Sequence, residues 1–335
     1  VPRGAEHRCG SLAQMKAVVT TGANGGVPVV EERPDPVAGA GEILVRVHAA
    51  GVNNADLLQA KGVYPAPPGS PPDILGLELA GEVVANGPGA RRFRPGDRVM
   101  AVVGGGAQAS LAVIHERLAM PIPDSMPWAE AGGFPEAFTT AHDALFTQGE
   151  LGPGARVCIH GAAGGVGSAG VQLAGAVHAR IVATVRNPDQ RRTVEALAPG
   201  VTAIAPDGFG TAGPFDVVLE LIGAPNIEAD LASLAPGGRI VIIGVGAGAE
   251  ARINLHVLMS VRGRIMASTL RSRPLEQKAD AARRIESQVL PLVTQGLIRV
   301  PIAATYPLDE APSAYARFAE GAKLGKIVLI AGGGP

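Results

Sequence analysis

Cysteine is scarce in this chain of 335 residues, which has only Cys9 and Cys158. A fold stapled by disulfides is therefore excluded, and we expect a reducing, cytoplasmic compartment. No apolar stretch approaches the ~20 residues that a membrane span needs. Lys and Arg number 29 against 30 Asp and Glu, so the chain has no basic excess for nucleic acid or an anionic membrane surface. We therefore expect neither nucleic acid nor a membrane as a partner.

Aromatic residues make up only 3% of the chain, whereas glycine (46) and proline (28) are abundant. Because 47% of the residues are hydrophobic, this composition favours tight turns and close backbone packing over disorder. The length accommodates two domains of roughly 100 to 200 residues each. The chain opens with Val-Pro-Arg-Gly, which resembles the remnant of a thrombin-cleavage linker. We interpret residues 1–14 as a tag or a disordered leader.

A glycine-rich turn follows a short apolar run in the middle of the chain. Residues 157–159 predict a buried parallel strand, and residues 168–177 predict the helix that follows the turn. Gly161, Gly164 and Gly167 are spaced so that the backbone can turn tightly and approach a pyrophosphate at the helix N-terminus. The pattern predicts a dinucleotide site; the alternative interpretation is a plain tight turn between buried elements.

Four further apolar segments follow at the spacing of strands that alternate with helices: 180–185, 216–222, 239–243 and 264–269. This order predicts a doubly wound parallel sheet, an α/β Rossmann fold. Right-handed crossovers would place the cofactor at the carboxyl ends of these strands. Those ends carry the residues 161–167, 184–187, 221–224 and 244–248.

Residues 15–138 have a different pattern: short runs of alternating apolar and polar residues are separated by clusters of turn-forming residues. This pattern predicts a small, bent antiparallel β domain with strands at 15–20, 42–50, 78–86, 97–103 and 109–115. Helices are predicted at 129–148 and 274–292, and a final strand at 325–330. We expect that tail to return to the first domain. The Rossmann domain, residues 139–269, is then inserted into a β-rich domain made of residues 15–138 and 270–335.

Several motifs resemble one known family, and they occur in its order: Met-Lys-Ala-Val-Val at 15–19, Gly-Val-Asn-Asn-Ala-Asp at 51–56, Leu-Gly-Leu-Glu at 75–78, Pro-Gly-Asp-Arg-Val at 95–99, His-Gly-Ala-Ala-Gly-Gly-Val-Gly at 160–167 and Leu-Ala-Pro-Gly-Gly-Arg at 234–239. Together they resemble the medium-chain dehydrogenase/reductase superfamily and its zinc-free quinone oxidoreductase branch, which includes zeta-crystallin. Segments 134–137 and 268–276 resemble the p53-inducible quinone oxidoreductase subgroup. The resemblance implies that the β-rich domain is GroES-like.

The resemblance also bears on metal binding. Zinc members of the family use Cys, His and Cys at positions that here carry Asn53, Leu77 and, nearby, Glu136. Leucine offers no ligand atom, and an Asn amide is a poor zinc ligand compared with thiolate or imidazole. We therefore expect no zinc. The histidines are scattered without ligand spacing; His160, which ends the first Rossmann strand, is interpreted as structural or as facing the cofactor.

The end of the second Rossmann strand bears on the choice of nicotinamide. NAD-selective folds place an acid about 20 residues after the glycine motif, where it accepts from the ribose 2′-OH. The sequence has Arg186 there, and Arg191 follows, so guanidinium groups are available for a 2′-phosphate. NADPH is therefore the predicted cofactor. Asp189 is the counter-evidence, and the arginines have a second interpretation as a solvated helix start.

Further site residues follow from the resemblance. Asn53 and Tyr64 match the residues that this branch places near the nicotinamide and acceptor, so they are the predicted hydrogen-bond donors to the acceptor oxygen. Their alternative roles are a turn residue and a packed ring. The other predicted cofactor contacts are Thr140, Gly161, Ala163, Gly164, Gly165, Val166, Gly167, Thr184, Arg186, Arg191, Ile222, Gly244, Val245, Gly246, Ser268, Leu270, Arg271 and Lys326.

The activity implied by the resemblance is NADPH-dependent reduction of a quinone. Hydride transfer of this kind needs an oriented nicotinamide and donors for the oxygen that gains charge, and no metal. Two alternatives stay open. One is reduction of the double bond of an enal or enone, and the other is a non-catalytic, crystallin-like protein that binds NADPH. Relatives also imply a homodimer formed near residues 239–243.

Overall fold

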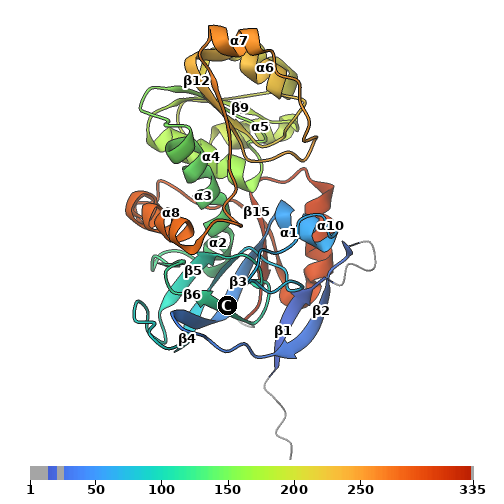
Figure 1. Ribbon diagram of the computed structural model, residues 1–335, viewed down its shortest axis with the longest axis vertical. Coiled ribbons are helices and arrows are strands. Elements are labelled where there is room, and N and C mark those ends of the chain that lie inside the picture. Colours follow the sequence, from blue (N-terminus) through green and yellow to red (C-terminus); the bar gives the residue numbers. More distant parts are fainter. Residues whose placement is uncertain (1–13, 21–25, 333–335) are drawn as a thin grey trace, which may run out of the picture.

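Two sheets organise the chain (Figure 1). The computed structural model describes residues 14–20 and 26–332. The predicted leader lies outside these described residues, apart from Gln14, which opens strand β1 (Gln14–Val19). The six-stranded sheet occupies the upper part of Figure 1, and the seven-stranded sheet occupies the lower part. None of the helices in the described part has the length and apolar character that crossing a membrane requires.

The six-stranded sheet is parallel throughout and has the order β10-β9-β8-β11-β12-β13. Its central strands are buried, as expected of strands covered on both faces by helices. The predicted doubly wound sheet is therefore confirmed. The strands are β8 (Arg156–Ile159), β9 (Arg180–Thr184), β10 (Val201–Ile204), β11 (Phe215–Glu220), β12 (Leu234–Ile242) and β13 (Arg264–Ala267).

The seven-stranded sheet is mostly antiparallel. Its path is β14-β15-β3-β4-β5-β7, with β6 paired to β3, while β1 and β2 form a separate ribbon. The C-terminal strand β15 (Lys326–Ile330) lies antiparallel to β3 (Glu42–Val52), so the chain does return to its first domain after the parallel sheet. The other strands are β2 (Val29–Pro34), β4 (Glu78–Asn86), β5 (Arg98–Val102), β6 (Leu111–His115), β7 (Ala119–Pro121) and β14 (Ile302–Pro307).

The predicted single helix at 129–148 is wrong, because the structure divides it into three pieces. These are α2 (Trp128–Gly133), α3 (Pro135–His142) and a π-helical turn, η2 (Asp143–Gln148). Pro135 has no backbone N–H and so cannot continue the hydrogen-bond ladder of α2; α2 therefore ends and α3 begins there, although Phe134 itself keeps helical dihedrals. The predicted helix at 274–292 is likewise two helices, α8 (Leu275–Gln288) and α9 (Leu290–Thr294), broken before Pro291.

The remaining helices cover the two sheets. Those packed with the parallel sheet are α4 (Gly165–Ala176), α5 (Arg191–Glu195), α6 (Ile227–Ala232) and α7 (Leu255–Ser260). The β-rich domain adds α1 (Asn54–Ala60) and α10 (Ala311–Glu320). Short 3₁₀ turns are η3 (Pro188–Gln190), η4 (Pro206–Ala212) and η5 (Leu308–Glu310). The limits predicted for the two domains stay a prediction; residue 139 falls inside α3.

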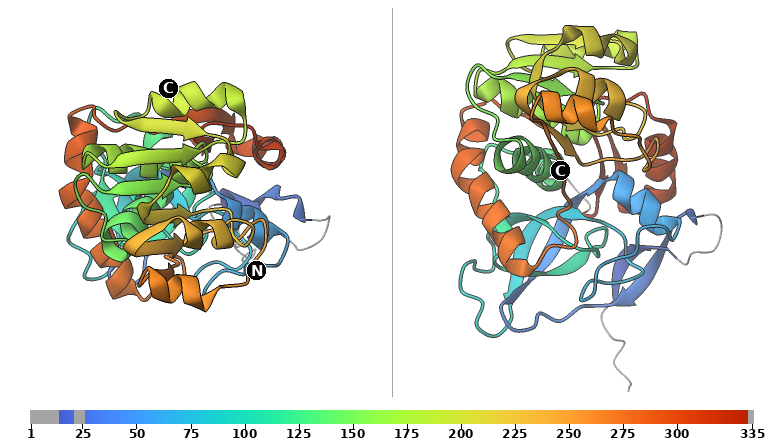
Figure 2. Two further views of the ribbon diagram at one scale, coloured as in Figure 1. Left: turned by 90° about the horizontal axis from the view of Figure 1, so that it is seen from above. Right: turned by 45° about the horizontal axis from the view of Figure 1, so that its top comes forward.

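One apolar core joins the two sheets. Phe134 and Phe138 stack with ring centroids 4.4 Å apart, and both belong to the cluster that also contains Met100 of β5 and Ile159 of β8. Helix α8 adds Ile285 to the same cluster. Figure 2 shows this helix, in orange, on one flank of the molecule and α10, in dark red, on the other. The shared core holds the carboxyl ends of the parallel strands close to the β-rich domain.

Candidate active site

The glycine-rich turn between β8 and α4 fits a phosphate. Gly161 has φ +59°, a left-handed conformation that favours glycine. A Cβ on Gly167 would collide with the carbonyl oxygen of Gly161, so the helix packs on the strand at a distance that only glycine allows. A Cβ on Gly164 would meet only the Gly161 oxygen, at 3.3 Å. The α4 N-terminus is thereby left open to an anion, which is the arrangement that a pyrophosphate needs.

The other predicted cofactor residues of the Rossmann domain meet at the same edge of the sheet. The Gly161 amide donates to Oγ1 of Thr184 at the end of β9 (3.3 Å). A Cβ on Gly161 would lie 3.2 Å from the side chain of Ile222, which follows β11. Gly244, after β12, packs so closely that its Cβ would meet the Leu221 carbonyl oxygen at 2.5 Å. Four strand ends therefore converge as the sequence predicts.

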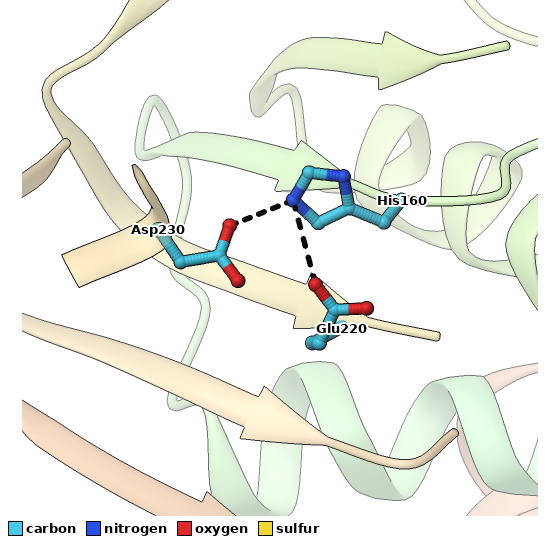
Figure 3. Close-up of side chains that lie close together, drawn as sticks. All are labelled: His160, Glu220 and Asp230. Atoms are coloured by element: carbon cyan, nitrogen blue, oxygen red, sulfur yellow. Dashed lines mark hydrogen bonds and ion pairs between the residues drawn. The ribbon is translucent and has the colours of Figure 1, made fainter. Parts of the chain in front are cut away.

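A buried polar cluster lies beneath these turns, and we call His160, Glu220 and Asp230 the strand-end cluster (Figure 3). His160 Nε2 lies 2.8 Å from Asp230 Oδ1 and 3.8 Å from Glu220 Oε2, and all three side chains are fully buried. The His160 ring also contacts Thr184 Oγ1 through Nδ1 (3.1 Å). His160 is thus a structural residue that faces the core, which is one of the two interpretations open from the sequence.

The strand-end cluster contacts two segments at the cofactor edge: the turn after β11, through Glu220, and Thr184 at the end of β9, through His160. Glu220 accepts hydrogen bonds from the backbone amides of Ile222 and Gly223 and from Asn226 Nδ2. Burial raises the pKa of Asp230 to about 7 and also raises the pKa of Glu220, whereas it lowers the pKa of His160. These residue types suit a cation such as zinc. However, both oxygens of Glu220 already accept hydrogen bonds, so the geometry favours a network held together by protons.

The predicted 2′-phosphate residues lie at the end of β9. Arg186 is exposed, and so is Asp189, the acid that would favour NADH instead. Arg191 is half-buried, and its Nε donates to the Val185 carbonyl oxygen (3.3 Å), which ties this guanidinium to the strand end. Of these two arginines, only Arg191 has a hydrogen-bond partner among the described residues, so the Arg186 guanidinium is available to a ligand.

A second polar cluster lies in the β-rich domain, and we call Asn53, Glu78, Glu136 and Lys326 the cleft cluster. Lys326 Nζ lies 2.5 Å from Asn53 Oδ1 and 2.6 Å from Glu78 Oε1. Asn53 Nδ2 donates to the same Glu78 oxygen (2.9 Å), so the amide is oriented at both ends. Because Asn Nδ2 carries two hydrogens, one donor remains. Asn53 also precedes α1, and its backbone N–H donates to Asp56 Oδ2 (2.8 Å).

Lys326 connects the cleft cluster to the cofactor turn. A Cβ on Gly165, in the first turn of α4, would lie 2.7 Å from Lys326 Cδ. The lysine is 4% exposed and the carboxylate of Glu78 is fully buried. Leu77 is also buried and offers no ligand atom, so an ammonium supplies the positive charge at this point. The residues present at the positions of the family's zinc ligands do not fit a zinc ion.

Glu136 completes the cleft cluster from the first turn of α3. Its backbone N–H donates to Glu78 Oε2 (2.8 Å), and its Oε1 accepts from Thr140 Oγ1 (3.3 Å). Its Oε2 is buried without a hydrogen-bond partner. Burial, followed by the charge of Glu78, raises the pKa of Glu136 to about 7. Sequence reasoning treated Glu136 only as a lost zinc ligand, and Thr140 as a direct cofactor contact.

Tyr64 lies just beyond α1. Its hydroxyl is 3.3 Å from Thr269 Oγ1, and its ring lies under the Arg271 guanidinium, 5.0 Å from the centroid. Arg271 is 5% exposed and donates to the carbonyl oxygens of Gly104 and Tyr64 and to Gln59. Arg271 therefore holds the Tyr64 loop, and each of its three nitrogens donates to a protein group. By the predicted limits Arg271 belongs to the β-rich domain, and it is the Tyr64–Thr269 contact that reaches the Rossmann domain.

Two other predicted residues of this segment are also engaged. Ser268 Oγ donates to Asp143 Oδ2 (3.1 Å) and accepts from Arg273, and the side chain of Leu270 is buried. A cavity of about 630 Å³ adjoins the segment, between η2 and α8. Its lining includes Thr139, Ser268 and Thr269 but none of the cleft cluster. The cavity therefore does not include Asn53, one of the two predicted donors to the acceptor.

Two family models match the chain. The alcohol dehydrogenase GroES-like domain matches residues 39–124, and the zinc-binding dehydrogenase model matches residues 201–329. A stretch of the polyketide synthase GfsB of Streptomyces halstedii is 34% identical over 296 residues, which cover 86% of this chain and 5% of that protein. The chain therefore spans only a small fraction of the polyketide synthases that it matches.

Solved structures extend the likeness over nearly the whole chain. The quinone oxidoreductase of Pseudomonas syringae pv. tomato DC3000 superposes with a TM-score of 0.83 at 26% identity and covers 95% of this chain and 100% of its own. A mycobacterial protein in complex with NADPH has a TM-score of 0.83 at 25% identity, with the same coverage of 95% and 100%. With a Rossmann sheet inserted in a GroES-like domain, the chain belongs to the medium-chain dehydrogenase/reductase superfamily and is an oxidoreductase of that family.

Proposed function

We propose that this protein is an NADPH-dependent quinone oxidoreductase that works without a metal. The observation that carries the proposal is the position of the Lys326 ammonium, within hydrogen-bond distance of Asn53 and Glu78. A cation that belongs to the chain lies against Asn53, one of the positions where the resemblance expects a zinc ligand in zinc members of the family. Activation of the acceptor therefore falls to hydrogen-bond donors, which suffices for a quinone because the hydroquinone anion is a stable product.

The acceptor side consists of Asn53 and Tyr64. The cofactor, when bound, supplies the hydride. Asn53 is held by Lys326 and Glu78, so its remaining N–H is preorganised to donate to the acceptor oxygen. The Tyr64 hydroxyl, which contacts Thr269, is the second donor. The likeness to a quinone oxidoreductase of Pseudomonas syringae supports this assignment.

The preference for NADPH rests on Arg186, which is exposed at the end of β9 and lies beyond the glycine turn. An Arg can grip a 2′-phosphate bidentately. We expect Arg186→Ala to weaken NADPH binding by about tenfold and to leave NADH binding unchanged. Titration calorimetry with both cofactors measures this, and equal affinity of the unaltered protein for the two would remove the preference.

A second candidate is reduction of the double bond of an enal or enone. The similarity to polyketide synthases favours it, because two of them, from Alternaria cinerariae and Aspergillus terreus, are named as highly reducing. The same donors, Asn53 and Tyr64, would stabilise the enolate that forms when hydride adds to the conjugated carbon. This candidate shares the cofactor site with the first and differs only in the acceptor.

One experiment separates these readings. The absorbance of NADPH is followed in the presence of ortho-quinones, para-quinones, enals and enones. We expect the fastest oxidation with quinones; faster oxidation with enones would transfer the assignment to the second candidate. Tight NADPH binding without oxidation by any acceptor would identify the non-catalytic, crystallin-like alternative. The cytoplasmic location predicted from cysteine usage stays a prediction.

We also propose a homodimer. Strand β13 is at the edge of the parallel sheet, and exposed apolar side chains lie close to it in the chain, including Leu255 (65% exposed) and Met259 (71% exposed) on α7. Such side chains are typical of an interface. Light scattering should give the mass of two chains, and Leu255→Arg combined with Met259→Arg should give that of one. A monomer in the unaltered protein would contradict the dimer.

A further inference from the structure

The loop between α10 and β15, residues 321–325, brings the β-rich domain onto the cofactor edge of the Rossmann domain. The Gly325 amide donates to the carbonyl oxygen of Ala163, inside the glycine-rich turn (2.8 Å). At the other end of the loop, a Cβ on Gly321 would lie 3.8 Å from a terminal nitrogen of Arg186. The loop therefore extends from the pyrophosphate turn to the end of β9, where the ribose phosphate of NADPH is expected.

Positive side chains surround this loop. Arg317 donates to the Gly321 carbonyl oxygen (2.8 Å) and pairs with Glu320 (3.4 Å). Lys326 is held by Asn53 and Glu78, as described above. These two cations are compensated by protein groups. The remaining cation of the loop is Lys323.

Lys323 has only neutral partners. Its Nζ donates to the Gly325 carbonyl oxygen (3.3 Å) and lies over the Phe318 ring, 4.2 Å from the centroid. Within the part of the chain that the structure describes, no carboxylate lies within ion-pair distance of it. Burial and the neighbouring charges of Lys326 and Arg317 lower the pKa of Lys323 to about 8. A half-buried ammonium among other cations is unfavourable unless an anion neutralises it.

The nearest place for an anion is the cofactor turn. Gly325 accepts from Lys323 and donates to Ala163, so the ammonium is two hydrogen bonds from the α4 N-terminus. That terminus attracts phosphate through its free amides and dipole. We propose that Lys323 is a phosphate ligand of the bound cofactor, supplied by the β-rich domain across the cleft from Arg186. The proposal rests on the proposed function only in requiring a nicotinamide dinucleotide, and it is independent of the acceptor.

This ligand couples cofactor binding to the relation between the two domains. The glycine turn and Arg186 belong to the Rossmann domain, whereas Lys323 belongs to the returning C-terminal segment. A phosphate held from both sides would link the domains without any change in the cleft cluster. The phosphate belongs either to the pyrophosphate, which every nicotinamide dinucleotide carries, or to the 2′-phosphate, which only NADPH carries.

Equilibrium binding tests the proposal without any turnover. Calorimetry measures the Kd of NADPH and NADH for the unaltered protein and for Lys323→Gln, which removes the charge. We expect a rise of about tenfold in the Kd of NADPH, because a charge-assisted hydrogen bond is lost. An equal rise for NADH assigns the lysine to the pyrophosphate, and an unchanged NADH value assigns it to the 2′-phosphate.

Two further variants complete the experiment. Lys323→Arg keeps the charge and should bind NADPH within about twofold of the unaltered protein, which separates loss of a phosphate contact from damage to the loop. Lys278→Gln is the matched control, because Lys278 is also half-buried with a pKa lowered by burial, but lies on α8. The proposal is overturned if Lys323→Gln and Lys278→Gln bind both cofactors alike. If the unaltered protein binds neither cofactor, the proposed function fails together with it, whereas intact binding that ignores Lys323 removes only this inference.

Discussion

The molecule holds two buried polar clusters of similar composition, and only one of them contains a fixed cation. The strand-end cluster has two carboxyl groups and one imidazole, and its positive charge can come only from bound protons. The cleft cluster also has two carboxyl groups, but Lys326 pairs with one of them. The strand-end cluster, whose positive charge comes from protons, braces turns, whereas the cleft cluster, which contains the lysine, keeps an Asn53 N–H available for a ligand.

The two clusters differ in which of their polar atoms have no hydrogen-bond partner among the described residues. In the strand-end cluster, Glu220 uses both oxygens on amide donors, and within the described residues only an acid oxygen, Asp230 Oδ2, is left buried without a partner. In the cleft cluster, one Asn53 hydrogen and Glu136 Oε2 have no protein partner. Buried polar atoms without partners are costly. Both clusters have such an oxygen, and what distinguishes the cleft cluster is the additional N–H of Asn53, which a ligand oxygen would satisfy.

The largest expected effect comes from removing the cation of the cleft cluster. Lys326→Met should lower the free energy of unfolding by about 3–5 kcal/mol, because the carboxylate of Glu78 would stay buried without its partner. Urea denaturation measures this. The double variant Lys326→Met with Glu78→Gln should recover most of the loss. A single variant within about 0.5 kcal/mol of the unaltered protein would mean that Lys326 does not neutralise Glu78.

A somewhat smaller effect is expected from the donors. Asn53→Ala should lower turnover about 10²-fold, the usual loss for one preorganised donor, and Tyr64→Phe about tenfold. The Kd of NADPH should stay nearly constant in both variants, which calorimetry checks. Asn54→Ala is the matched control, because Asn54 is the exposed neighbour of Asn53. Unchanged turnover in both donor variants would remove Asn53 and Tyr64 from the proposed site.

The smallest expected effect is a change in pH dependence at the strand-end cluster. Burial raises the pKa of Asp230 to about 7, so the folded protein keeps a proton that the unfolded chain releases near 3.8. The stability contributed by this proton is present below the unfolded value and is lost as the pH rises toward 7. Asp230→Asn should therefore lose less stability between pH 4 and pH 7, by on the order of 1 kcal/mol for each pH unit.

Urea denaturation across this pH range measures the difference. Asp56 and Glu136, whose pKa values burial also raises to about 7, are present in both proteins and cancel in the comparison. His160 opposes the trend, because burial lowers its pKa and the unfolded chain gains the proton as the pH falls. Parallel stability profiles for the two proteins would show that Asp230 does not carry a buried proton.

Local patterns predicted most strands. The run at 78–86 has the bounds of β4, because its apolar residues alternate between clear turn signals. Strand β10, at 201–204, was not predicted, since it has four residues and lies half-buried at the sheet edge. Helix α10 was also missed. The break at Pro135 was readable in principle from the proline, but the apolar residues around it continue a helical period.

In the candidate site, too, local features were predictable from the sequence and long-range contacts were not. The glycine turn was predictable because its spacing encodes a local backbone geometry that needs no distant partner. The roles of Lys326 and Glu136 were not, because each depends on a side chain far away in the sequence. Lys326 and Asn53 are 273 positions apart, and Glu136 and Glu78 are 58 apart. Burial, which raises the pKa of Glu136 to about 7, is likewise a property of the packed domains.

The sequence by itself determined the parallel sheet, the phosphate turn and the residues at the positions of the family's zinc ligands, because periodicity, glycine spacing and residue chemistry are local properties of the chain. The tertiary structure alone decided that Lys326 lies against Asn53 and Glu78, that His160 turns to the core, and that Lys323 lies against Gly325 and Phe318. The contacts of Lys326 arise only when strand β15 returns to β3, which brings charges from opposite ends of the chain into one poorly solvated space, whereas those of His160 depend on the packing of the parallel sheet alone.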